Sequence, residues 1–136
     1  MNSKKALIAG VVGGIVLWIA GFVLHGLIMG STYMKYTEVF SQEEEPMNML
    51  WFLVIALGIA IVAAFLFAKT RSCWAEGVAG GAKYGVFLGL FSFFPQFYNS
   101  LIYEGFPYYL NWCWGGISFI QMVILGVVLA AVYKQG

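Results

Sequence analysis

Four long apolar stretches limit most strongly what this chain can fold into. They cover residues 6–29, 47–68, 77–98 and 112–133. An α-helix rises 1.5 Å per residue, so about 20 residues cross a hydrocarbon core that is ~30 Å thick. The stretches are continuously apolar and do not alternate, which excludes a transmembrane barrel. We therefore predict an all-α fold, in which residues 1–136 form a single domain, a four-helix transmembrane bundle.

The composition agrees with a lipid environment. Of the 136 residues, 62% are hydrophobic and 10% are charged, whereas about 25% of the residues of a soluble domain are charged. The net charge of +1 and the absence of a basic patch give no reason to expect nucleic acid as a partner. The first stretch exceeds the roughly 7–15 apolar residues of a signal peptide, and we expect it to be a retained helix.

The charged residues predict the orientation of the chain. Basic residues lie before the first stretch, after the second and after the fourth: Lys4, Lys5, Lys69, Arg71 and Lys134. Acidic residues lie in the other two connections: Glu38, Glu43, Glu44, Glu45 and Glu104. Because loops rich in lysine and arginine stay in the cytoplasm, both termini are expected inside.

Small residues recur at every fourth position. In the first and third stretches these residues are Gly10, Gly14, Gly77, Gly81, Gly85 and Gly89. A glycine within a helix costs about 1 kcal/mol relative to alanine, so the repetition needs a reason. In lipid, helices associate through close backbone approach, which small residues permit. We predict that these glycines pack the bundle. We call each row of small residues along a helix a stripe. The alternative is that part of one stripe forms an interface between two chains.

The two halves of the chain share a short pattern. "GVVGG" at residues 10–14 resembles "GVAGG" at residues 77–81. Two hairpins of the same orientation would be parallel repeats, as some transporters have. Glycine-rich membrane helices also match by chance, so the sequence leaves both explanations open.

Polar residues gather near the outer ends of three stretches. His25, Gln96, Asn99 and Asn111 share roughly one depth, and Tyr103 lies nearby. Pro95 lacks an N–H and is expected to kink the third stretch at this depth. One hypothesis is a binding site for a small lipophilic ligand, namely a lipid, a quinone or a pigment. The alternative is that these groups hydrogen-bond each other and fix the register of the helices.

His25 is the only histidine, and it raises the question of a cofactor. Neighbouring glycines would leave room for a haem or chlorophyll ring, with His25 as a candidate axial ligand. A single histidine cannot supply both axial ligands. The chain also lacks the spacing of histidine, cysteine and acidic residues that is typical of zinc or di-iron sites. We predict no metal and no cofactor.

The stretch from residue 85 to residue 133 carries a family resemblance. Its features are Pro95, Asn99, the pair Glu104 and Gly105, a tryptophan in the next span, and the pair Leu125 and Gly126. The chain resembles small bacterial four-helix membrane proteins that are catalogued as a domain of unknown function. Where that family often has tryptophan and tyrosine, this chain has Leu24 and His25. The resemblance implies a bacterial cytoplasmic membrane protein and no particular activity.

No nucleophile–base pair, phosphate-binding loop or buried acid relay is evident in the sequence, so we do not expect an enzyme. We expect an accessory or scaffold subunit that packs in a larger membrane complex or in a homo-oligomer. The alternative is a binding protein or carrier for a small lipophilic ligand at the outer end of the bundle.

Overall fold

The computed structural model describes residues 1–40 and 46–134, and these residues are mostly helical. The elements are, in chain order, α1 (Ser3–Gly21), the π-helix η1 (Phe22–Ile28), α2 (Gly30–Tyr33), α3 (Pro46–Lys69), the 3-10 helix η2 (Arg71–Cys73), α4 (Gly77–Phe93), the 3-10 helix η3 (Phe94–Phe97), α5 (Tyr98–Ile102) and α6 (Tyr108–Val132). The acidic run Glu43, Glu44 and Glu45, which supports the predicted orientation, lies outside the described residues.

Among the residues that the structure describes, four helical segments are long and apolar enough to cross a membrane. They are Ser3–Ile28, Asn48–Lys69, Gly77–Ile102 and Tyr108–Val132. The described part of the chain contains no strand, and the predicted all-α, four-helix fold is confirmed. The third segment continues to Ile102, beyond the predicted residue 98, because the chain stays helical on both sides of Pro95.

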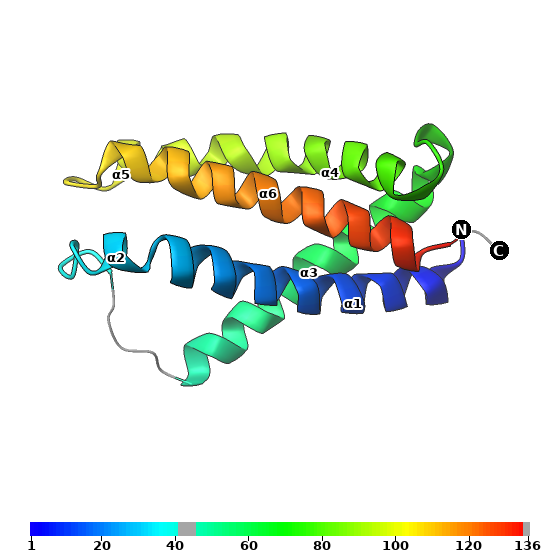
Figure 1. Cartoon of the computed structure of the whole chain (residues 1–136), viewed down its shortest axis with the longest axis horizontal. Helices are drawn as coiled ribbons and strands as arrows, with labels where there is room; N and C mark the ends of the chain where they lie inside the picture. Colours follow the sequence, from blue (N-terminus) through cyan, green and yellow to red (C-terminus); the bar gives the residue numbers. More distant parts are fainter. Residues whose placement is uncertain (41–45, 135–136) are drawn as a thin grey trace.

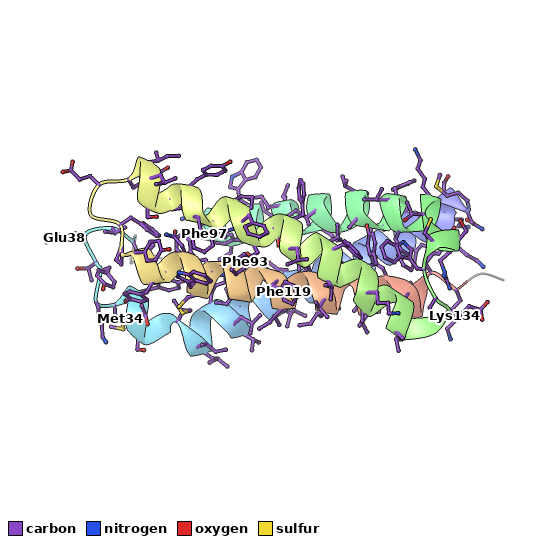
Figure 2. All side chains as sticks on the ribbon, turned by 90° about the horizontal axis from the view of Figure 1, so that it is seen from above. Met34, Glu38, Phe93, Phe97, Phe119 and Lys134 are labelled. Carbon is purple, nitrogen blue, oxygen red and sulfur yellow. The ribbon has the colours of Figure 1, made fainter. Side chains whose placement is uncertain are left out.

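The helices form two pairs that α1 and α6 join. α4 packs along α6, α1 packs on α3, and α1 contacts α6. Figure 1 shows α4 and α6 running side by side, whereas α3 crosses α1 diagonally and diverges from the other helices in its first half. We call the end with both chain termini the terminal end and the opposite end the far end. Figure 2 shows Lys134 at the terminal end and Met34 and Glu38 at the far end.

The terminal end is densely packed. Its buried side chains include Ala60, Ala64, Phe67, Tyr84, Leu125, Leu129 and Tyr133. The Tyr84 hydroxyl donates a hydrogen bond of 2.7 Å to the Ala63 carbonyl, which ties α4 to α3. The Asn2 backbone N–H donates to the Tyr133 hydroxyl over 3.1 Å, which joins the two ends of the chain. Side chains and backbone from all four long helices therefore meet here.

Glycines let the two helices within each pair approach closely. A Cβ added to Gly10 would lie 2.7 Å from the Ile61 Cα atom, and one added to Gly14 would lie 2.8 Å from the Leu57 Cα atom. Both contacts join the backbone of α1 to that of α3. In the other pair, three glycines of α4 lie directly against α6: Gly81, Gly85 and Gly89. Contacts of this closeness leave no room for a side chain.

Gly77 differs from the other glycines of the stripe. Its φ of +72° lies in the left-handed region that favours glycine, and no atom lies within 4 Å of the position where a Cβ would be. It is the first residue of α4, directly after the turn, and not a point of helix contact. The prediction that Gly77 packs against another helix was therefore wrong. Gly10, its counterpart in the possible repeat, does pack on a neighbouring helix.

Two helices lose α-helical geometry toward the far end. α1 changes into the π-helix η1 at Phe22, and α4 changes into the 3-10 helix η3 at Phe94. Pro95 lies in the first turn of η3, where its missing N–H interrupts the α-helical hydrogen bonds. The sequence predicted a break at Pro95 but contained no comparable signal for η1.

Candidate functional site

Three side chains from different elements meet at the far end. His25 from η1, Tyr33 from α2 and Trp114 from α6 form what we call the His25 triad. The His25 Nδ1 atom lies 2.6 Å from the Tyr33 hydroxyl oxygen, and the Trp114 Nε1–H donates to the same oxygen over 2.7 Å. The His25 and Tyr33 rings are nearly parallel, at 15°. The triad thus links the first and last membrane segments through one phenol.

The local fold explains why His25 and Tyr33 meet. In η1 the helix is wider than an α-helix, and such segments often occur at functional sites. The chain ends η1 at Ile28 and enters α2, where the Tyr33 N–H donates to the Met29 carbonyl over 3.0 Å. This short turn carries the Tyr33 ring back beside His25, which lies eight residues earlier.

Aromatic side chains surround the triad. The Phe40 and Phe106 rings pack edge-on against Trp114, with ring centroids 5.7 and 5.3 Å away. Burial raises the pKa of the Tyr33 phenol above its ordinary value. Tyr33 therefore stays protonated at neutral pH and keeps a proton to donate, while its oxygen accepts the hydrogen bond from Trp114.

The other residues of the hypothesised site do not join His25. The Asn99 Nδ2 atom donates to the Gln96 carbonyl over 2.9 Å, and the Gln96 Nε2 atom lies 3.5 Å from the Ser92 carbonyl. Both side chains thus satisfy carbonyls of their own helical segment, as polar side chains do near an interrupted helix. Tyr103 is 61% exposed. Within the described part of the chain, hydrogen bonds therefore do not join the five predicted residues into one network.

Asn111 forms a separate polar contact. It is completely buried, and its Nδ2 atom donates to the Ser100 hydroxyl over 2.7 Å. Its Oδ1 atom has no hydrogen-bond partner within the described part of the chain. This bond joins α6 to α5, so Asn111 helps to fix the far end of the second helix pair.

Sequence reasoning missed Tyr33, Trp114 and Ser100 as partners. Tyrosine and tryptophan residues near the ends of membrane spans commonly belong to an aromatic belt at the membrane interface, so their residue type did not distinguish these two. One signal was available, because Tyr33 follows His25 by about two helical turns. The indole of Trp114 is 81 positions from Tyr33, and no local spacing could reveal that contact.

A second feature is an apolar groove on the face formed by α4 and α6. Its volume is about 440 Å³, and its lining residues are Leu90, Phe93, Phe94, Gly116, Phe119 and Ile120. Figure 2 shows Phe93 and Phe119 on neighbouring helices. No atom lies within 4 Å of the position where a Gly116 Cβ would be, so this glycine leaves the groove open.

Over residues 1–40 and 46–134, no group of three or more histidine, cysteine or acidic side chains is arranged to hold a metal ion. The Nδ1 atom of His25 is hydrogen-bonded to the Tyr33 phenol, so only the Nε2 atom is left to bind another group.

Comparison with known families identifies the chain. A family described as a protein of unknown function, DUF1761, matches residues 8–130. The chain belongs to this family. DUF1761 membership confirms the resemblance that rested on Pro95, Asn99 and the following residues, and it adds no activity. No curated protein and no solved structure matches the chain.

Proposed function

We propose that this DUF1761 protein is a non-catalytic accessory or scaffold subunit of the bacterial cytoplasmic membrane, with both termini inside. Its partners would be the lipid bilayer and other membrane subunits or copies of itself. One observation carries the proposal: the first half of α3 diverges from the other helices (Figure 1). A helix from another subunit would give this half of α3 the neighbour that its own chain does not provide.

Most of the buried side chains of α3 lie in its second half, although one face of that half is also exposed. Trp51 and Phe52 in the first half are 57% and 59% exposed. Ala60 and Ala64 in the second half are 0% and 1% exposed, and Ala60 lies against Gly10 and Gly13 of α1. Apolar side chains gain little in lipid from burial alone, so association there depends on van der Waals contact. The broad aromatic surface of the first half supplies such contact area.

Photo-cross-linking in native membranes, from a thiol-reactive benzophenone attached to a single introduced cysteine, tests this proposal. Cys73 and Cys113 are the only cysteines, so a Cys73→Ser, Cys113→Ser chain gives a clean background. In this background, Phe52→Cys should cross-link to one discrete partner, which is either a second copy or another subunit. The matched control is Val62→Cys, which is on the same helix and 70% exposed. Equal cross-linking at both positions, or none at Phe52→Cys, would contradict assembly through this surface.

A second candidate function is binding of a small lipophilic ligand. One observation favours it: the His25 Nε2 atom has no hydrogen-bond partner among the described residues, although Nδ1 is engaged. A polar atom of this kind at membrane depth is a binding-site hypothesis by default. Ligand binding and assembly do not exclude each other, since they use different helices.

A further inference from the structure

We infer that His25 donates a hydrogen bond from its Nε2 atom to the carbonyl oxygen of a small lipophilic molecule at the far end. The inference rests on the second candidate function and names the donor atom and the class of ligand. It is independent of the assembly proposed for α3.

The triad determines where the imidazole proton lies. The indole of Trp114 has a donor and no acceptor, so the Tyr33 oxygen must accept its hydrogen bond. The Tyr33 hydroxyl then has one proton to donate, and the His25 Nδ1 atom is 2.6 Å away. If Nδ1 accepts that proton, the neutral imidazole carries its own proton on Nε2. The opposite tautomer would direct two donors at the Tyr33 oxygen and leave the hydroxyl proton without this acceptor.

The Nε2 atom of His25 is accessible to a molecule outside the protein. Two side-chain nitrogen or oxygen atoms in the described part of the chain are both buried and unpartnered, namely Trp18 Nε1 and Asn111 Oδ1. The Nε2 atom of His25 also has no partner, but it is absent from this buried group. It is therefore accessible from outside the protein. Beside it, Gly26 has no atom within 4 Å of a Cβ position, which leaves the helix surface open to a flat group.

The medium around this donor is apolar. Leu27 and Ile28, which follow Gly26, are 82% and 62% exposed. An N–H group without an acceptor in such a medium is costly, because no water replaces the lost hydrogen bond. Carbonyl oxygens are acceptors that membrane-soluble molecules carry, either in a quinone ring or in the ester of a phospholipid. A protonated Nε2 has no lone pair for a metal, so this tautomer disfavours the axial-ligand role.

Nitrogen NMR on the full chain in lipid nanodiscs tests the inference. Because His25 is the only histidine, labelling with ¹⁵N-histidine gives one imidazole to observe. We expect the proton on Nε2. Nanodiscs of ether lipids lack ester carbonyls, so they separate the two sources. A saturable shift of Nε2–H when a short-chain benzoquinone is added identifies a quinone. A difference between ester-lipid and ether-lipid nanodiscs without quinone identifies a phospholipid ester.

Two further results would overturn the inference. One is a proton on Nδ1, and the other is an Nε2–H signal that is identical in both lipids and does not respond to the benzoquinone. Quenching of tryptophan fluorescence by the benzoquinone distinguishes a failure of His25 as the donor from a failure of ligand binding as a whole. We expect His25→Ala to weaken saturable quenching roughly two- to tenfold, as the loss of one hydrogen bond predicts. Equal affinity in both chains would keep ligand binding and reject His25 as the donor.

Discussion

The terminal and far ends of this protein differ in helix geometry and in the kind of contact that joins their helices. At the terminal end, the four long helices keep α-helical geometry and their backbones touch, as where Gly85 of α4 meets Met122 and Val123 of α6. At the far end, α1 and α4 change into other helix types, and aromatic and polar side chains make the contacts. In a membrane, irregular backbone persists only where protein or a cavity surrounds it. The comparison therefore places close backbone packing at one end and aromatic and polar side-chain contacts at the other.

The largest effect is expected at the terminal end, from Gly85→Leu. An added Cβ would lie 2.5 Å from the Met122 carbonyl oxygen and 2.7 Å from the Val123 Cα atom, and backbone cannot move aside as a side chain can. We expect a loss of about 3 kcal/mol or more of stability, at the upper end of overpacking costs. Unfolding in mild detergent against increasing denaturant measures it.

Gly58→Leu is the matched control for this substitution. No atom lies within 4 Å of a Cβ at Gly58, so the control should unfold nearly as wild type. Similar stability in both variants would mean that close backbone contact does not distinguish the terminal end.

A smaller effect is expected at the far end, from Tyr33→Phe. The change removes the oxygen that accepts from Trp114 and the proton that Nδ1 of His25 receives. We expect a loss of about 2 kcal/mol, because two hydrogen bonds of about 1 kcal/mol each are lost. The emission spectrum of the tryptophans should shift. Tyr36→Phe removes an exposed hydroxyl pair with Tyr109, and it should change neither property.

Alkaline pH probes the same phenol without a substitution. Burial raises the pKa of Tyr33 above the value of about 10 of an unfolded tyrosine. The folded state therefore favours the protonated phenol. This contribution to stability is complete below about pH 10 and is lost as the pH rises through the folded-state pKa. In a tyrosinate absorbance titration, Tyr33→Phe should remove one phenol that ionises late; an unchanged curve would show that Tyr33 is not shielded.

The smallest effect is expected from Asn111→Leu. The change gives up the hydrogen bond from Nδ2 to Ser100, but it also removes the buried, unpartnered Oδ1 atom. Because these two terms oppose each other, we expect stability to change by about 1 kcal/mol or less. The same unfolding assay measures it. A loss of several kcal/mol would reveal that Oδ1 is bonded to a molecule such as a trapped water.

Much of the fold could be predicted from the sequence, and little of the site could. The break at Pro95 followed from its missing N–H, which is a property of the residue itself. Gly77 continued the spacing of the stripe, yet its position at the start of α4 removed it from any helix contact. His25 was recognised as unusual, but its partners depend on η1 and on a long-range contact with Trp114. Asn99 was grouped with it by depth alone, although depth does not say which way a side chain points.

That this DUF1761 chain is all-α with four membrane-capable helices follows from its residues alone, because the length of an apolar run suffices to define a span. Which glycines touch a neighbouring backbone, and which polar atoms meet, is set by the packing of the helices. Those outcomes depend on how each helix is rotated and crossed against the next. A single residue of π-helical or 3-10 geometry changes that rotation without leaving a strong trace in the sequence.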